Sequence, residues 1–105
     1  MQGTGKNPET GDSAFFKYKG MFLDHTVFDD YTNDTLQPVK HLIGSDKLIA
    51  GIDEGLRYMK EGGKARLLTP SSLAFGHSGV YGVIPGYTPL VWEVILLSVK
   101  ENPAK

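Results

Sequence analysis

In this chain of 105 residues, the side chains that could act as acids, bases or nucleophiles are not spaced to form a catalytic centre. Cysteine is absent, which removes thiolate catalysis, disulfides and zinc-thiolate sites together. His25, His41 and His77 are far apart, and none has a second ligand at helical spacing. We therefore predict no metal and no cofactor. Asp29, directly after Phe28, is the one suggestive acid.

Two glycine-containing segments resemble catalytic motifs only superficially. Residues 76–79, Gly-His-Ser-Gly, carry the serine on the wrong side of the Gly-x-Ser-x-Gly pattern, and no strand-turn-helix surrounds them. Residues 3–6, Gly-Thr-Gly-Lys, lack the full spacing of a phosphate-binding loop and follow no strand. We expect neither a serine hydrolase nor a nucleotide-binding site.

The composition excludes further classes of protein. The 11 Lys and Arg against 12 Asp and Glu give a formal charge of -1 with no basic cluster, so no nucleic-acid partner is expected. The longest apolar run, residues 94–97, is far shorter than the roughly 18 residues that span a bilayer. The length fits one domain. The lack of cysteine fits the cytoplasm and a bacterial cell envelope or periplasm equally well, which leaves the compartment open.

The segments that must position any site are mostly strands. Residues 14–23 alternate, with Phe16 and Tyr18 on one face and two lysines on the other, which predicts a half-buried strand. A hairpin turn at residues 24–25, a return strand over 26–28, a loop over 29–37 and a strand over 39–43 follow. Further strands are expected at 64–69 and at 90–97, the latter apolar enough to be central in its sheet.

Helical spacing occurs once, between the third and fourth of these strands. An apolar stripe recurs at Ile49, Ile52, Leu56 and Met59, Gly62-Gly63 is expected to end the helix, and the charged residues predicted to point outward are Asp53, Glu54, Arg57 and Lys60. Residues 70–89 form a connection too long for a compact domain and too apolar for a disordered linker, so we expect an ordered flap. One helix against several antiparallel strands predicts an α+β domain.

The order of short motifs resembles that of the FKBP family of peptidyl-prolyl isomerases, the immunophilins that bind the drug tacrolimus. The resemblance covers nearly the whole chain. Its fragments are Tyr18-Lys19-Gly20, residues 23–29 (Leu-Asp-His-Thr-Val-Phe-Asp), 48–56 (Leu-Ile-Ala-Gly-Ile-Asp-Glu-Gly-Leu), 59–67, Leu73-Ala74-Phe75-Gly76, Gly82-Val83-Ile84-Pro85 and 90–97.

This resemblance implies an FKBP-like antiparallel half-barrel wrapped around one short α-helix. The implied function is cis-trans isomerisation of X-Pro bonds in unfolded or flexible protein segments, which assists protein folding. Implied partners are proline-containing peptides and tacrolimus-type macrolides, bound by a monomer. Residues 1–105 would then form a single isomerase domain that lacks the family's first strand or has been excised from a longer protein.

The resemblance also implies a set of site residues. The positions matching catalytic ones are Tyr18, Phe28, Asp29, Ile49 and Phe75, and those matching substrate-binding ones are His41, Leu48, Ile52, Val83, Ile84 and Trp92. Tyr18, Phe28, Ile52 and Trp92 would surround the proline ring, and the Ile49 backbone N–H would hold a substrate carbonyl. Asp29 would orient Tyr18 or face the twisting amide.

Several positions depart from the family's pattern. Ile52 stands where many members have the tryptophan that floors the proline pocket, and His41 stands where they have a phenylalanine wall. Phe75 replaces a tyrosine whose hydroxyl reaches a bound carbonyl, Val80 replaces a flap histidine, and Gly86 interrupts the usual Pro-Pro. Two hypotheses therefore stay open, an isomerase of modest activity and a catalytically weak module that binds proline peptides or acts as a chaperone.

Overall fold

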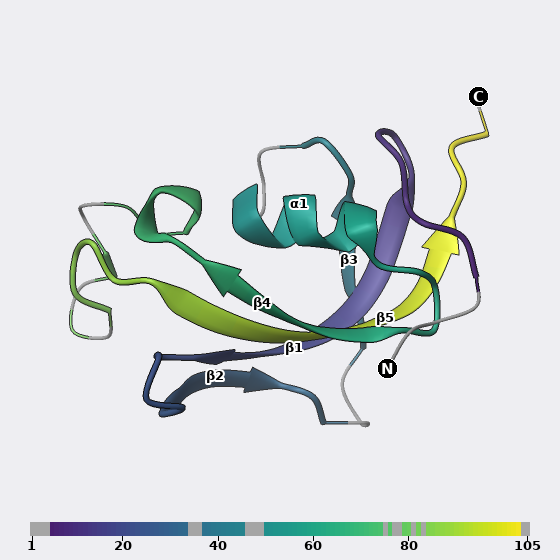
Figure 1. Cartoon of the computed structure of the whole chain (residues 1–105). Helices are drawn as coiled ribbons and strands as arrows, with labels where there is room; N and C mark the ends of the chain where they lie inside the picture. Colours follow the sequence, from purple (N-terminus) through teal and green to yellow (C-terminus); the bar gives the residue numbers. More distant parts are fainter. Residues whose placement is uncertain are drawn as a thin grey trace.

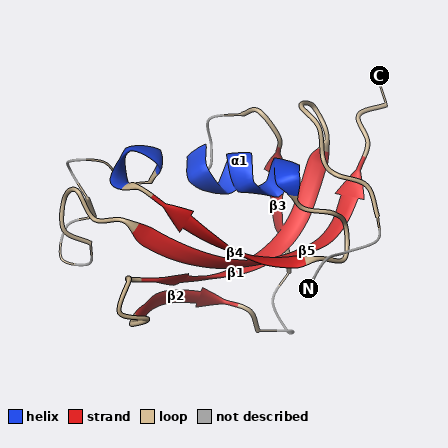
Figure 2. Ribbon diagram, viewed as in Figure 1, coloured by secondary structure: helices blue, strands red, loops and turns tan. Residues whose placement is uncertain are grey.

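The structure, a computed structural model, describes residues 5–33, 37–45, 50–74, 76, 79–80, 82 and 84–103. A curved antiparallel sheet carries one α-helix on one of its faces (Figures 1 and 2). In chain order the elements are β1 (Ser13–Met21), β2 (Val27–Tyr31), β3 (Val39–Leu42), α1 (Ala50–Tyr58), β4 (Lys64–Thr69), a short 3-10 helix (Ser71–Leu73) and β5 (Leu90–Lys100). The predicted α+β class is confirmed.

β1 and β5 are the two strands that connect the sheet. The strand order is β2-β1-β5-β4, and β3 pairs with β1 off this path. The first part of β1 pairs with β3, and its last part, Tyr18 to Met21, pairs with β2. β5 runs antiparallel to β1 along its whole length and pairs with β4 on its other edge. One end of the sheet is therefore built from β2, β1, β5 and β4 side by side.

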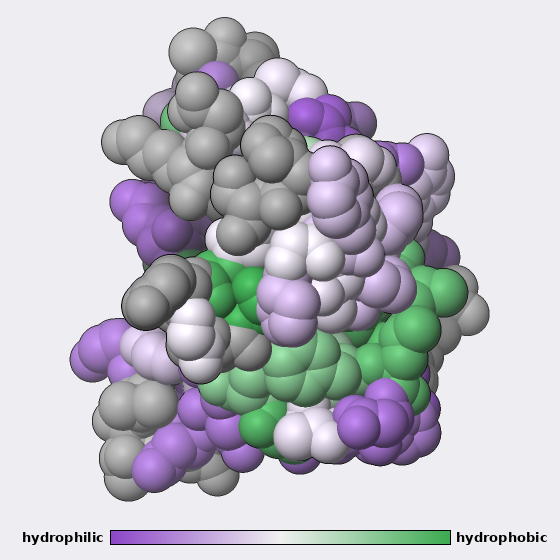
Figure 3. Space-filling view, turned by 90° about the vertical axis from the view of Figure 1, so that its left-hand side faces the viewer, coloured by the Kyte–Doolittle hydropathy of each residue, from purple (hydrophilic) through white to green (hydrophobic). Residues whose placement is uncertain are grey.

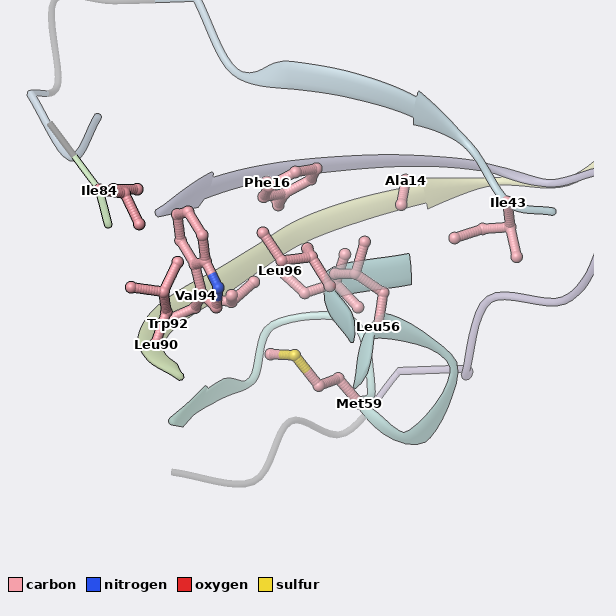
Figure 4. Packing of buried hydrophobic residues seen from close by; sticks show 11 residues of the cluster. Ala14, Phe16, Ile43, Leu56, Met59, Ile84, Leu90, Trp92, Val94 and Leu96 are labelled. Atoms are coloured by element: carbon pink, nitrogen blue, oxygen red, sulfur yellow. The ribbon is translucent and has the colours of Figure 1, made fainter. Parts of the chain in front are cut away.

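The core lies between the sheet and α1. Phe16 of β1 and Leu56 of α1 are completely buried, and the buried cluster continues along β5 (Figure 4). The helix approaches β4 closely at Gly55, since a Cβ there would lie 2.4 Å from the Leu67 side chain. Among the described residues, no helix is long and apolar enough to cross a membrane.

Some element boundaries differ from the predicted ones. β2 continues to Tyr31, because Tyr31 pairs across the strands with Tyr18, so Asp29 lies within a strand and does not open a loop. β1 ends at Met21, and the predicted hairpin turn is confirmed, with His25 at a φ of 72°. The helix ends at Tyr58, before the glycine pair, and β5 extends to Lys100. In the described part of residues 70–89, a β-bridge joins Val80 to Ile84.

Two charged residues predicted to point outward are largely covered. Lys17 is only 7% exposed, and its ammonium group donates to the Asn33 carbonyl at 2.7 Å. The Asp53 side chain is 14% exposed. One of its carboxylate oxygens lies 2.5 Å from the His41 ring nitrogen and accepts from the Gly44 backbone N–H, and the other accepts from Arg57. Helical periodicity predicts only the contact with Arg57, one turn further along α1, because the other partners come from β3 and from the turn after it.

Asp53→Asn is expected to reduce the free energy of unfolding by about 1–3 kcal/mol near neutral pH. Burial alone would raise the pKa of Asp53, but hydrogen bonds from Gly44, His41 and Arg57 hold it below its ordinary value of 3.8. This stabilisation is present above the unfolded-state pKa and is lost as the pH falls through the lower folded-state pKa.

Urea unfolding of both proteins between pH 3 and pH 7 measures this effect. The difference between wild type and Asp53→Asn should be largest near neutral pH and should shrink toward pH 3. Glu54→Gln, at the exposed neighbouring helix position, is the control and should leave stability nearly unchanged. A difference that is independent of pH would show that the Asp53 charge contributes nothing.

Candidate functional site

Three aromatic side chains from different strands meet at the end of the sheet where β2, β1 and β5 are neighbours. The Phe28 and Trp92 ring centroids are 5.4 Å apart with the ring planes at 81°, and Tyr18 meets Trp92 at 5.8 Å and 63°. Both arrangements are edge-to-face, the geometry that aromatic quadrupoles favour. Phe22 extends the cluster, with its ring centroid 5.2 Å from that of Phe28. The predicted residues Tyr18, Phe28 and Trp92 are thus brought together.

Gly20 makes this close packing possible. Gly20 is on β1, where it pairs with Trp92 of β5 and lies close to the Trp92 and Phe28 rings. A Cβ at this position would lie 2.6 Å from the Trp92 ring and 2.7 Å from the Phe28 ring, closer than carbon atoms can approach. A glycine inside an apolar strand pattern is a signal of close approach, and this position was not among the predicted site residues.

Asp29 is joined to the aromatic cluster through Tyr18. The Tyr18 hydroxyl donates to an Asp29 carboxylate oxygen at 2.8 Å. Burial and this hydrogen bond raise the pKa of Tyr18 to about 12, so the phenol stays protonated and remains a donor at neutral pH. Asp29 was expected either to orient Tyr18 or to face the twisting amide. The observed hydrogen bond is the contact that the first of these roles requires.

The Trp92 indole is fixed by a polar contact that sequence patterns do not indicate. Its ring N–H donates to the Thr69 hydroxyl at 3.2 Å, and that hydroxyl donates to the Leu90 carbonyl at 3.1 Å. Thr69 is 2% exposed and Trp92 3%, so the indole N–H depends on the Thr69 hydroxyl for a partner away from water. Thr69 closes β4, and no spacing rule connects a threonine there to a tryptophan on β5.

Thr69→Val is expected to lower the free energy of unfolding by about 1–3 kcal/mol, because the buried indole N–H loses its acceptor while the side-chain volume hardly changes. Thr69→Ser keeps the hydroxyl and should be closer to wild type. Urea unfolding of the three proteins checks this order. Equal stability of the valine variant would mean that the indole N–H finds another acceptor.

Ile52 and Ile84 line the same core as Trp92. Ile52 is 2% and Ile84 4% exposed, and both belong to the buried cluster that contains the indole. Ile84 lies beside Trp92 at one end of that cluster, whereas Ile43 and Ala14 lie at the other (Figure 4). The flap residue Ile84 and the helix residue Ile52 therefore join the strands on the apolar side of the site.

His41 is not brought to the aromatic cluster. It pairs with Ala14 near the start of β1, whereas Trp92 pairs with Gly20 near its end, and the strand spans roughly 20 Å between the two. His41 is also buried and hydrogen-bonded to Asp53, so its ring is not exposed at the surface. The remaining predicted positions lie outside the described residues: Leu48, Ile49, Phe75 and Val83.

The surface at this end of the molecule has an apolar centre. The space-filling view shows hydrophobic surface across the middle of the end that lies at the left in Figure 1, with hydrophilic surface along its lower border (Figure 3). Leu23 and Val27, which flank the β1–β2 hairpin turn, are 56% and 45% exposed. Apolar residues are therefore available at the surface next to the aromatic cluster.

The site can bind an apolar group and remove it from water, and its polar atoms are few. No cluster of three or more potential metal-ligating side chains occurs within the described ranges. Beside the aromatic rings, the titratable side chains of Tyr18 and Asp29 form a hydrogen-bonded pair. Such an arrangement favours a process in which a bound group changes its conformation in an apolar environment.

The comparison with protein families identifies this process. The family model for FKBP-type peptidyl-prolyl cis-trans isomerases matches residues 4–97. The chain belongs to this family. It is an isomerase of X-Pro peptide bonds and assists protein folding, and the predicted family, fold and class of enzyme are confirmed.

Relatives in bacteria cover this chain almost completely. An FK506-binding protein of Neisseria meningitidis serogroup B is 40% identical over 101 residues, which are 96% of this chain and 92% of the relative. The isomerase FkpA of Escherichia coli K12 is 40% identical over 102 residues, again 96% of this chain but 36% of the relative. The similarity thus extends over most of a small relative and over about a third of a larger one.

Solved structures agree with this assignment. A peptidyl-prolyl cis-trans isomerase from Pseudomonas syringae pv. tomato superposes with a TM-score of 0.83 at 34% identity, covering 96% of this chain and 71% of that one. The crystal structure of E. coli FkpA gives a TM-score of 0.82 at 37% identity, covering 97% of this chain and 46% of that one. The half-barrel around one helix is therefore the fold of this family.

Proposed function

We propose that the X-Pro bond is bound and isomerised at the aromatic cluster of Tyr18, Phe28 and Trp92, with Ile52 and Ile84 completing its apolar side. The observation that carries this proposal is the Tyr18–Asp29 hydrogen bond next to the perpendicular Phe28–Trp92 pair. It supplies one oriented polar group at the border of an apolar site, which is what binding a proline ring beside its amide requires.

The chemistry needs no acid, base or metal. Rotation about an X-Pro bond crosses a barrier of roughly 18–20 kcal/mol, because amide resonance keeps the bond planar. The planar amide is more polar than the twisted transition state, so an apolar site that removes water from the carbonyl favours the twisted form. A rate increase of about 10⁴-fold corresponds to roughly 5–6 kcal/mol of selective stabilisation.

Asp29 acts in this proposal by holding the Tyr18 hydroxyl. A protonated phenol bonded to a carboxylate keeps its ring fixed, so the wall that it offers to the proline does not have to be reorganised on binding. From the family resemblance we further assign the Ile49 backbone N–H to a substrate carbonyl, Phe75 to the catalytic positions, and Leu48 and Val83 to substrate binding. His41 is the weakest member of the proposed set, because it lies at the other end of β1.

Activity below that of typical members is expected from two substitutions. Ile52 offers less contact area to a proline ring than an indole does, and Phe75 lacks a hydroxyl worth about 0.5–1.5 kcal/mol. Since Ile52 is part of the tightly buried cluster, Ile52→Trp tests whether the site tolerates a larger floor. If it does, kcat/KM should rise.

A protease-coupled assay on a Leu-Pro and a Phe-Pro peptide tests the proposal, with wild type, Tyr18→Phe and Phe28→Ala compared at equal concentration. Wild type should accelerate isomerisation, and both variants should be slower. If wild type is active and both variants match it, the active site lies elsewhere. A wild-type rate equal to the uncatalysed rate would favour the alternative, a proline-peptide binding or chaperone module.

We also propose that a tacrolimus-type macrolide binds at this site and that the protein acts as a monomer. The support for the first is that the Neisseria relative is named an FK506-binding protein. Added FK506 should then inhibit isomerisation in competition with the peptide. Light scattering in solution should give the mass of one chain, 11.5 kDa.

A further inference from the structure

Tyr31 is a neighbour of the site that neither the sequence motifs nor the family resemblance single out. It is the last residue of β2 and pairs directly with Tyr18 of β1. The two rings are stacked, with centroids 5.7 Å apart and planes at 9°. Directly opposed aromatic residues on antiparallel strands stabilise each other's side-chain conformation.

Within the described part of the chain, three rings contact Tyr18. Trp92 meets it edge-on, Phe16 lies at 6.2 Å with a tilted ring, and Tyr31 covers a face. Phe16 and Trp92 belong to the buried core, whereas Tyr31 is only half-buried. Of these three described contacts, the one with Tyr31 is therefore the contact that lies nearest the solvent.

Tyr31 is itself held at its far end. Its hydroxyl donates to the Gln37 backbone carbonyl at 2.8 Å, across the connection that leads from β2 to β3. A ring fixed by a stack at one face and by a hydrogen bond at its tip loses little freedom when a substrate arrives. It offers Tyr18 a rigid surface that an aliphatic residue would not.

We infer that Tyr31 is a positioning residue for the isomerase site, which keeps the Tyr18 ring in the orientation that places its hydroxyl on Asp29. This inference rests on the proposed role of Tyr18. In the proposed mechanism Tyr31 contacts no reacting atom, and it affects turnover only by positioning the Tyr18 hydroxyl.

A double-mutant cycle tests the inference. Tyr31→Leu in the native background should lower kcat/KM for a Leu-Pro peptide by about two- to tenfold, the size expected from losing an aromatic stack. In the Tyr18→Phe background the same substitution should change kcat/KM by less than about twofold, because the hydroxyl that it positions is already absent. Tyr31→Phe, which keeps the stack, should retain most of the activity.

A spectroscopic readout separates positioning from stability. The carbon-13 resonance of the Tyr18 carbon that bears the hydroxyl, recorded at pH 7, reports the bond to Asp29. Tyr31→Leu should shift it toward its position in Asp29→Ala. The control is Tyr58→Leu, at a residue 81% exposed at the end of α1, which should leave both readouts unchanged.

The possible outcomes distinguish the positioning role of Tyr31 from the proposed location of the site. If Tyr18→Phe lowers activity and Tyr31→Leu does not, or if Tyr31→Leu is equally harmful in both backgrounds, the positioning role is wrong and the proposed site stands. An unshifted Tyr18 resonance in Tyr31→Leu also overturns the positioning role. If Tyr18→Phe is itself fully active, the proposed site fails first.

Discussion

Asp29→Ala is expected to lower kcat/KM for an X-Pro peptide by about tenfold to a hundredfold, since a hydrogen bond to a charged group contributes about 1.5–3 kcal/mol. The substitution leaves the Tyr18 hydroxyl without the acceptor that lies 2.8 Å away. The hydroxyl then has no fixed partner and the Tyr18 ring is held by its aromatic neighbours alone, so the site loses its oriented polar group while the core beneath it keeps its packing. Stability should change little, because Asp29 is exposed.

The adjacent Asp30 provides a matched control for this prediction. It alternates with Asp29 along β2 and pairs with Lys19, whose side chain lies on the other face of the sheet from Tyr18. Asp30→Ala removes the same charge next to the site without touching the Tyr18 hydroxyl, and it should leave kcat/KM within about twofold of wild type. An equal loss in both variants would point to the electrostatic field of β2 and not to the hydrogen bond.

Gly20→Ala is expected to reduce both stability and activity. Its Cβ would lie 2.6 Å from Trp92 and 2.7 Å from Phe28, so at least one ring must move. Overpacking of this kind typically costs about 1–3 kcal/mol of unfolding free energy. Because the displaced rings form the proposed proline site, kcat/KM should also fall, by about tenfold or more if the rings shift as a pair.

Gly62→Ala separates these two effects. A Cβ at Gly62 would meet nothing within 4 Å, but the residue has a φ of +88°, a conformation that alanine adopts only at a cost. This variant should lose stability without losing activity when it is assayed under conditions where it is folded. Gly20→Ala with wild-type kcat/KM would contradict the proposed location of the site.

The order of the motifs predicted the family. The alternating and helical periodicities, which can be read from a single sequence, predicted most of the strands and the helix. The strand bounds were less predictable at Asp29 to Tyr31. This stretch pairs with residues 18–20 of β1, and Tyr31 stacks on Tyr18, which are contacts between residues distant in the sequence. Local propensity contains no information about such a pair.

The site was predictable where a motif carried it and not where packing created it. Tyr18, Phe28 and Trp92 come together as the family resemblance implies. Thr69 was not predicted, because its hydroxyl accepts a hydrogen bond from an indole on the neighbouring strand β5. His41 was assigned because it stands where family members have a phenylalanine, but its buried bond to Asp53 depends on how α1 lies against β3.

The most direct test uses Trp92, the only tryptophan in the chain. Its single indole N–H resonance can be followed by NMR while a Leu-Pro peptide is added, with the peptide's own cis-trans exchange measured in the same sample. Proline binding beside the ring predicts a saturable shift of this resonance, accelerated exchange, and neither effect with a Leu-Ala peptide. Accelerated exchange with an unshifted indole resonance would contradict the proposed site, and exchange at the uncatalysed rate would contradict catalysis itself.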